Sequence, residues 1–326
     1  MDAQLGDPRV SLVVVPDAAP HTKPKALDFA LPLCTGEHVV VFDAEDIPDP
    51  DQLWKAALRF RDQPELACVQ ARLLVDNGDQ GWLAAMFAAE YAGLFAVLLP
   101  ALARWHLPLP LGGSSNHFRT SALRQIGGWD AFNVTEDADL GIRLARRRLR
   151  VETLDSNTRE HAPLRLRTWL GQRTRWMKGW MQTFIVHNRN PGRLLTEMGL
   201  GPTLVFEVLV LGMIVAPLLH CGLVISMMLQ LVCGAPLFDG RGWSVFYSGV
   251  LGLGFGSSIA ITLLGLARSG GLRLAFLQLL LPLYWLLIAG ATLSALADLL
   301  RRPFYWFKTP HRPVGNIAGQ LQNRPL

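Results

Sequence analysis

Hydrophobic and polar positions divide the chain into two unlike parts. Up to about residue 200 the apolar runs are short and alternate with charged or polar turns, and nearly all acidic residues lie there. From Leu204 onward the apolar runs are long and uncharged. The pattern predicts a soluble domain over residues 1–200, transmembrane helices over 201–300 and a basic, aromatic interfacial tail over 301–326.

The short runs of the first part predict alternating strands and helices. A strand followed by a helix and a second strand implies a crossover connection between parallel neighbours. We therefore expect an α/β domain with a mostly parallel sheet, whose strand ends would gather the ligand. The predicted elements are strands over 10–15, 38–42 and 66–71, a helix over 22–33, and a helix that starts at Pro48 and Pro50 with Leu53, Ala56, Ala57 and Phe60 on one face.

Two further helices are predicted in the first part. Residues 82–107 are long and apolar enough to cross a membrane, but Glu90 and Arg104 interrupt them. Because an ionised carboxylate is costly at mid-bilayer, we interpret this segment as a buried or interfacial helix of the soluble domain. Residues 135–150 begin with acidic groups and end with arginines, the order that suits the helix macrodipole.

Three later runs, 204–232, 247–267 and 274–299, are each long enough to cross a hydrocarbon core about 30 Å thick. Pro217 and His220 interrupt the first run, so the sequence leaves three or four spans open. No secretory signal peptide opens the sequence, and targeting would come from these spans. We expect a multi-pass protein of the inner (plasma) membrane with its first part in the cytoplasm.

The formal net charge is only +5, but its placement is informative. Arginines crowd the segment 143–178, which runs into the first long apolar stretch. Such a block suits anionic lipid headgroups or a diphosphate. No nucleic-acid recognition motif accompanies it, so we expect membrane lipids and no nucleic acid among the partners.

Two carboxylates follow the predicted strand 38–42. Asp43 and Glu45 stand at positions i and i+2 of a strand end, where both can reach a hard cation such as Mg²⁺ or Mn²⁺. A cation held by two carboxylates keeps open positions for diphosphate oxygens. The alternative interpretation is a polar turn before Pro48.

A second acidic cluster, Thr135-Glu136-Asp137, begins the predicted helix 135–150 and follows a Gly- and Ser-rich segment that ends at Asn116. A carboxylate at a helix start can serve as the general base that removes a proton from a sugar hydroxyl. Its alternative role is a helix cap.

The basic block contains a third cluster, Gln172, Arg175 and Trp176. An indole face suits a sugar ring, Gln can pair with hydroxyls, and Arg can offset the charge of a departing diphosphate. With Trp169 and Trp180, the same indole also fits an aromatic belt at a membrane interface.

The order and spacing of the three clusters, followed by membrane spans, resemble family 2 glycosyltransferases of the processive cellulose, hyaluronan and chitin synthase group. The resemblance covers about residues 10–312. It implies a partial GT-A-like, Rossmann-related domain and an inverting hexosyltransferase. It also implies a UDP- or GDP-sugar donor, a glycan acceptor and a Mg²⁺ or Mn²⁺ cofactor.

The resemblance implies a role for each matching residue. Lys23, Asp43 and Glu45 would bind the donor, the two acids through the metal ion, with Asp46 as a further acidic neighbour. Asp137 would be the catalytic base. The residues implied to contact the acceptor or the diphosphate are Glu136, Gln172, Arg175, Trp176 and Asn116.

One departure from the family pattern concerns the start of the chain. Family members begin with two further strand-helix units, and nothing before Val10 supplies them. A truncated reading frame, which we favour, a split enzyme and an inactive paralogue each explain this. The alternatives to a polysaccharide-extending transferase are a polyprenyl-phosphate sugar synthase and an inactive pseudoenzyme that acts as a membrane scaffold.

Overall fold

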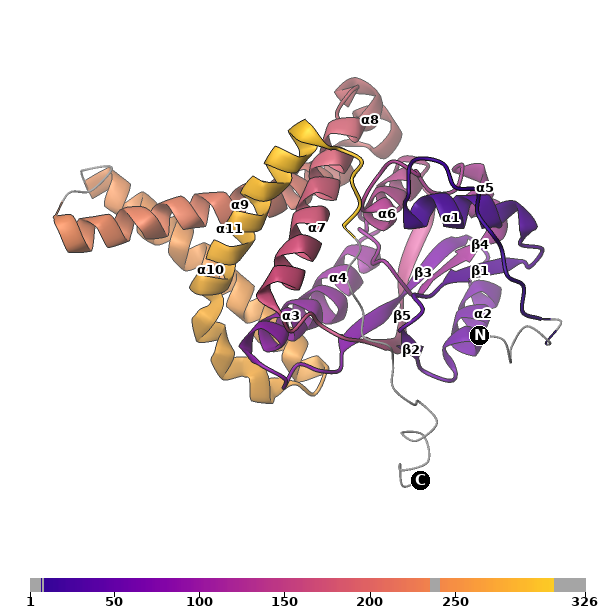
Figure 1. The fold of residues 1–326 in the computed structure, drawn as a ribbon, viewed down its shortest axis with the longest axis horizontal. Coiled ribbons are helices and arrows are strands. Elements are labelled where there is room, and N and C mark those ends of the chain that lie inside the picture. Colours follow the sequence, from indigo (N-terminus) through magenta and orange to yellow (C-terminus); the bar gives the residue numbers. More distant parts are fainter. Residues whose placement is uncertain (1–6, 8, 235–240, 308–326) are drawn as a thin grey trace.

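A five-stranded sheet and a group of long helices make up the protein in the computed structural model, which describes residues 7, 9–234 and 241–307. Figure 1 shows α1, α2 and α5 beside the sheet on one side of the molecule and the long helices on the other side. The strands are β1 (His38–Val41), β2 (Ile47–Pro48), β3 (Leu66–Val75), β4 (Asn116–Arg119) and β5 (Arg150–Glu160). The shorter helices are α1 (Lys23–Ala30), η2 (Leu31–Leu33), α2 (Gln52–Asp62), α3 (Trp82–Gly93), η3 (Leu94–Leu98), α4 (Leu99–Arg104), α5 (Thr120–Gln125), α6 (Glu136–Arg146), α8 (Pro191–Met198) and η4 (Leu272–Leu280). The longer helices are α7 (Leu166–His187), α9 (Leu200–Cys233), α10 (Arg241–Arg268) and α11 (Leu281–Arg301).

The strand order is β1-β4-β3-β5-β2. β3 and β5 run parallel, whereas β1 with β4, β4 with β3, and β2 with β5 are antiparallel. The α/β class is therefore confirmed, but the expected mostly parallel sheet is wrong for the described strands. The reason is the segment 10–15, which forms no strand: Leu12 and Val14 are exposed, and β1 pairs with the much later β4.

The predicted helices and strands of the first part otherwise lie where the apolar pattern placed them. β3 is the central strand of the five, and its first six residues are therefore all buried. In α2, Ala56 and Phe60 face the core, but Leu53 is 58% exposed, so the predicted inner face is narrower than expected. α6 ends at Arg146 because the chain turns at Arg148, which has a positive φ, before β5 begins.

Four helices are long and apolar enough to cross a membrane by length and composition. The first, Trp82–Arg104, has 72% of its apolar window buried inside the protein, as expected for a helix of the soluble domain. The other three, Leu200–Cys233, Val245–Arg268 and Leu272–Arg301, are mostly exposed along their apolar windows and match the three expected spans. α9 continues through Pro217, so the first of these runs is one helix.

α7 lies between the sheet domain and α11 and packs along α11 (Figure 1). The residues after α11 then return across α7: Lys178 donates hydrogen bonds to the carbonyl oxygens of Tyr305 (2.7 Å) and Arg302 (3.4 Å), and Gln182 donates to that of Pro303 (3.1 Å). Residues 308–326 of the expected tail lie outside the described residues. The arrangement places the third sequence cluster, on α7, between the sheet and the apolar helices.

Candidate active site

Asp43 follows the end of β1 and meets a lysine from α1. Thr22 caps α1 by accepting a hydrogen bond from the Lys25 amide (3.5 Å), which places Lys23 at the first helical position. The Lys23 ammonium forms an ion pair with Asp43 and donates to the Gly113 carbonyl oxygen (2.7 Å). Two residues expected to bind the donor thus lie together against the glycine segment.

The charge of Lys23 is stabilised by the site. Burial disfavours its ammonium form, but the carboxylates of Asp43, Glu136 and Asp137 outweigh that effect and the pKa of Lys23 is raised. A cation therefore lies among three acidic side chains, where it can also attract the phosphates of a ligand.

Asp46 shapes the acidic turn. Its carboxylate accepts hydrogen bonds from the Asp43 amide (3.0 Å) and from the Ser114 hydroxyl. Burial raises the pKa of Asp46, and these two donors oppose the shift. Asp46 therefore closes the turn that carries Asp43 and Glu45.

The Gly- and Ser-rich segment that starts at residue 112 is held by Gln70 of β3. Its side-chain amide donates to the Ser114 carbonyl oxygen (2.9 Å), and its oxygen accepts from the Gly112 amide (2.8 Å). Asn116 donates to the Gly112 carbonyl oxygen (2.6 Å). The sequence interpretation missed Gln70, although a lone polar residue inside the apolar run 66–71 was a usable signal.

Asp137 opens α6 beside the same glycine segment. A Cβ atom added to Gly113 would lie 3.2 Å from Asp137 Oδ2, so a larger residue there would crowd the carboxylate. The Gly113 carbonyl oxygen is also the acceptor of Lys23. The acidic turn and the Thr135-Glu136-Asp137 cluster therefore share one site.

Burial and mutual repulsion set the protonation of this acidic pair. Glu136 is only 4% exposed, and burial together with the Asp137 charge raises the pKa of Glu136 to about 8. Burial also raises the pKa of Asp137, against the opposing effects of the Ala138 amide, Lys23 and Arg175. A carboxylate whose pKa moves toward neutrality has the basicity that proton abstraction needs.

The start of α6 is anchored by a buried network. Asp139 accepts hydrogen bonds from His187 Nε2 (3.0 Å) and Arg143 Nε (2.8 Å), and Arg146 donates to His187 Nδ1 (2.9 Å). These contacts assign the neutral tautomer with hydrogen on Nε2. Burial opposes the Asp139 charge, but His187 and Arg143 lower its pKa below the ordinary value. The network fixes α6, and with it Asp137, against α7.

Arg175 of α7 reaches the same site. It donates a hydrogen bond to the Val134 carbonyl oxygen (3.2 Å), directly before the acidic cluster. Burial lowers the pKa of Arg175, against the stabilising charges of Glu136, Asp137 and Asp43. All three sequence clusters therefore contribute charged groups to one place.

Trp176 and Gln172 lie one helical turn apart on α7. The half-buried indole packs near Phe87 (ring centroids 5.8 Å apart) and Tyr91 (6.3 Å) of α3. Among the described residues, the buried oxygen atoms Oε1 of Gln172 and Oδ1 of Asn116 have no hydrogen-bond partner. Unpaired buried acceptors of this kind call for donors such as ligand hydroxyls.

The sequence interpretation missed Glu160, which ends β5 next to the acidic turn. Burial raises the pKa of Glu160 to about 8, and the nearby charges of Asp46, Asp43 and Glu45 contribute, while a hydrogen bond from Tyr91 opposes the shift. Tyr91 thereby connects Glu160 to Trp176. The sequence contained no signal for Glu160, because the strand that positions it, β5, was not predicted.

Asp43 and Glu45 fit a divalent cation that binds together with its substrate. Among the described residues no group of three or more His, Cys, Asp or Glu side chains is arranged to hold a metal ion. Mg²⁺ needs only one or two carboxylates when phosphate oxygens and water complete its coordination. The donor set thus suits a cation shared with a diphosphate.

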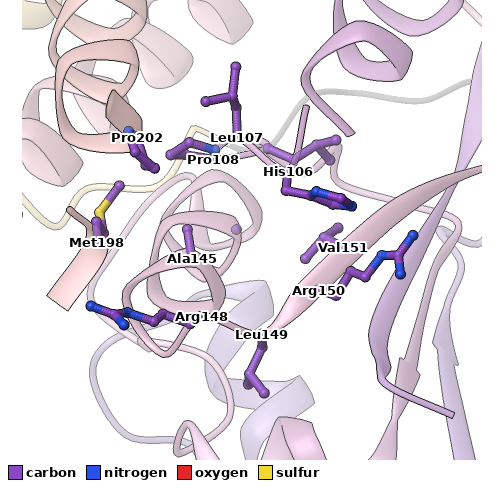
Figure 2. A pocket seen from close by; sticks show the side chains of 12 residues that line it. His106, Leu107, Pro108, Ala145, Arg148, Leu149, Arg150, Val151, Met198 and Pro202 are labelled. Atoms are coloured by element: carbon purple, nitrogen blue, oxygen red, sulfur yellow. The ribbon is translucent and has the colours of Figure 1, made fainter. Parts of the chain in front are cut away.

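A separate cavity of about 350 Å³ lies away from these residues (Figure 2). Its basic lining residues are already engaged: Arg148 donates to the carbonyl oxygens of Thr196 and Glu197, and Arg150 pairs with Glu65 and Glu152. None of the predicted site residues lines it. The other lining residues labelled in Figure 2 are His106, Leu107, Pro108, Ala145, Leu149, Val151, Met198 and Pro202.

The fold and site define a membrane-associated α/β protein with clustered carboxylates and cations at the end of its sheet. The chain belongs to the family described as Glycosyl transferase family group 2, which matches residues 38–297. The family 2 part of the resemblance is thereby confirmed, while the cellulose, hyaluronan and chitin synthase subgroup stays a prediction.

Curated relatives match part of the chain. It is 30% identical over 144 residues to glucomannan 4-beta-mannosyltransferase 2 of Arabidopsis thaliana, covering 44% of this chain and 27% of the relative. A probable glycosyltransferase of Bacillus subtilis is 23% identical over 169 residues, covering 52% and 40%. The chain therefore spans well under half the length of each of these relatives.

A solved structure is also similar. A mannosyltransferase of Pyrobaculum calidifontis, determined in complex with GDP-Man and Mn²⁺, aligns with a TM-score of 0.49 and 20% identity. The alignment covers 92% of this chain and 72% of the other.

Proposed function

We propose that the protein is a membrane-bound inverting glycosyltransferase that moves a sugar from a nucleotide-sugar to a hydroxyl of a growing glycan. The observation that carries the proposal is the convergence of three sequence clusters: Lys23 joins Asp43 to Gly113, Asp137 lies beside Gly113, and Arg175 lies among the carboxylates. The GT-A-like interpretation of the sheet domain belongs to the same proposal.

Asp137 is the catalytic base of the proposed reaction. Its carboxylate removes the proton of the acceptor hydroxyl as the hydroxyl oxygen attacks the anomeric carbon. Attack opposite the leaving diphosphate inverts the configuration at that carbon. The raised pKa of Asp137 suits this role, because a stronger base accepts the proton more readily near neutral pH.

Lys23 and Arg175 serve the leaving group. Both cations lie among the site's carboxylates, and the diphosphate gains negative charge as its bond to the sugar breaks. A divalent cation held by Asp43 and Glu45 would supply further charge stabilisation to that diphosphate. Fixed cations that face developing charge accelerate such a step without reorganisation.

Trp176, Gln172 and Asn116 form the proposed acceptor side, with Glu136 next to the base. The indole offers a stacking surface for a sugar ring, and the unpaired Gln172 and Asn116 oxygens offer acceptors for its hydroxyls. A stacked sugar is useful to an enzyme that extends a glycan. This feature favours a polysaccharide-extending enzyme over a synthase that loads one sugar onto a polyprenyl phosphate.

The Arabidopsis thaliana relative supports a mannosyl donor as the first to test, because it is named as a glucomannan 4-beta-mannosyltransferase. We propose a cytoplasmic catalytic domain over 1–200, spans over 201–300 in the inner (plasma) membrane and an interfacial tail over 301–326. The exposed apolar lengths of α9, α10 and α11 support this arrangement.

A donor screen tests the proposed function. Full-length protein in nanodiscs would be incubated with Mn²⁺ or Mg²⁺ and labelled GDP-mannose, UDP-glucose or UDP-N-acetylglucosamine, with and without β-1,4-mannohexaose. We expect one donor to give a labelled, lengthened oligosaccharide. A single-sugar, lipid-soluble product would instead indicate the polyprenyl-phosphate synthase, and no turnover of any donor would favour the membrane scaffold.

A further inference from the structure

A buried ion cluster joins the candidate acceptor platform to the apolar helices. Arg173 of α7 makes two hydrogen bonds to the carboxylate of Glu90 of α3, from Nη1 to Oε1 (2.6 Å) and from Nη2 to Oε2 (2.5 Å). The Tyr284 hydroxyl of α11 accepts from Arg173 (3.0 Å) and donates to Glu90 Oε2 (2.8 Å). One side chain from each of three helices therefore meets in a closed network.

The Arg173 side chain is buried, and its charge is paired with a Glu90 side chain that is 38% exposed. Arg173 is 5% exposed, and Tyr284 is 2% exposed. Burial opposes the guanidinium charge, but Glu90 and Tyr284 outweigh burial and raise the pKa of Arg173. A planar bidentate pair restricts a guanidinium more tightly than a lysine ammonium could.

Arg173 in turn contacts the indole of Trp176. The guanidinium carbon lies 4.8 Å from the centroid of the Trp176 ring and 4.9 Å from that of Phe87. The two α7 residues stand three apart, so they share a helix face. Phe87 and Tyr91 border the same indole from α3. Trp176 is therefore in contact with Arg173, which Glu90 and Tyr284 hold by hydrogen bonds.

We propose that Glu90, Arg173 and Tyr284 are positioning residues that hold Trp176 for the glycan acceptor, so that acceptor affinity depends on how α11 packs against α7. The inference rests on the proposed function and deepens it, because it adds a connection between a span-length helix and the acceptor platform. Glu90 and Tyr284 lie outside the three sequence clusters, and Arg173 lies within the third cluster without a role in the proposed chemistry.

The most direct variant is Tyr284→Phe, which removes one hydroxyl and keeps the ring. In nanodiscs, with GDP-mannose as donor, we expect the KM for β-1,4-mannohexaose to rise about tenfold. The reason is that the free energy of one hydrogen bond to a charged group corresponds to about a tenfold change in an equilibrium constant. The KM for GDP-mannose should stay within about twofold. Tyr247→Phe on α10, whose described ring contacts are to Trp243 and Phe246, is the matched control and should leave both constants unchanged.

A second variant and a binding measurement separate positioning from folding. Arg173→Lys keeps a charge but loses the bidentate geometry, and it should raise the KM for mannohexaose further than Tyr284→Phe does. Calorimetry with mannohexaose and no donor should show the tightest binding by wild-type protein, weaker binding by Tyr284→Phe and the weakest by Arg173→Lys. A purely structural cluster would lower the melting temperature and leave the acceptor affinity of the folded protein unchanged, which would overturn the inference.

The outcomes also distinguish this inference from the proposed function. If wild-type protein neither turns over GDP-mannose nor binds mannohexaose, the proposed function with these probes fails. If wild-type protein is active and Tyr284→Phe has the wild-type KM for mannohexaose, only the positioning role fails.

Discussion

At the residue scale, two glycines allow close contacts at the proposed catalytic groups. Gly113 leaves room for the Asp137 carboxylate, and Gly179 of α7 leaves room for Thr135, directly before the acidic cluster. A Cβ atom at Gly179 would clash with Oγ1, Cγ2 and Cβ of Thr135. The geometry of the base therefore depends on a contact between α7 and the residue that precedes α6.

Gly179→Ala should displace Thr135 and reduce both stability and transfer. We expect the free energy of unfolding to fall by about 1–3 kcal/mol, the usual cost of overpacking a tight contact. Thermal unfolding in detergent micelles measures this. Gly212→Ala in α9, where an added Cβ meets nothing within 4 Å, is the control and should not lower the melting temperature.

The acidic pair predicts a pH dependence of stability. In the unfolded chain Glu136 titrates near 4.5, whereas in the folded protein its pKa is about 8. Between these values the folded state binds more protons, so the contribution of Glu136 to stability is largest below pH 4.5 and is lost as the pH rises through 8.

Glu136→Gln removes this titration and keeps the shape of the side chain. Its melting temperature relative to wild type should therefore increase from pH 5 to pH 9. Differential scanning calorimetry at several pH values measures the difference. An offset that is constant across this range would contradict the raised pKa of Glu136.

At the element scale, α6 is held by α7 and α8 rather than by the sheet alone. Asp139, His187 and Arg146 link α6 to α7, and Arg146 reaches Glu197 of α8 (2.6 Å). His187 is 2% exposed, so its removal leaves a buried carboxylate short of a partner.

His187→Leu should destabilise the protein by about 2 kcal/mol, the cost of an unsatisfied buried group, and should lower kcat because α6 carries Asp137. Urea or thermal unfolding together with transfer kinetics checks both effects. His21→Leu, at a histidine whose side chain is 72% exposed, should change neither quantity. Equal behaviour of the two variants would show that the α6 anchor lies elsewhere.

The apolar pattern predicted β1, β3 and the helices α9, α10 and α11, because each is a continuous apolar run of strand or membrane length. It did not predict β5, whose inward positions include Ser156 and Thr158; these form hydrogen bonds instead of apolar contacts. The segment 10–15 shows the opposite error, because an apolar run without a pairing partner does not form a strand.

For the candidate site, too, the sequence predicted some residues and missed others. Asp43, Asp137 and Arg175 carried recognisable spacing in the sequence, and the structure brings them together. Gln70 and Glu160 gained their place only through the sheet, since their neighbours are distant in sequence. Residues positioned by long-range pairing could not be found from local patterns.

At the scale of the whole molecule, the proposed catalytic groups and the apolar helices are one connected structure. α7 carries Arg175 and Trp176 and packs along α11, and Lys178 and Gln182 hold the residues that follow α11. The exposed apolar surfaces of α9, α10 and α11 are large enough that water is an unsuitable solvent for them.

The protein should therefore behave as an integral membrane protein. After washing with alkaline sodium carbonate, expressed protein should stay with the membrane fraction and should be extracted only by detergent. Flotation on a density gradient checks the association. Release of folded protein by carbonate would contradict the assignment of these helices as spans.

The central claim is that Asp137 accepts the proton of the attacking hydroxyl. The most direct measurement compares sugar transfer by wild-type protein and Asp137→Asn in nanodiscs, with the active donor from the screen and mannohexaose as acceptor. We predict that Asp137→Asn binds the donor and melts near the wild-type temperature, but transfers at least about 10²-fold more slowly. Transfer at the wild-type rate by a folded Asp137→Asn protein would contradict the account.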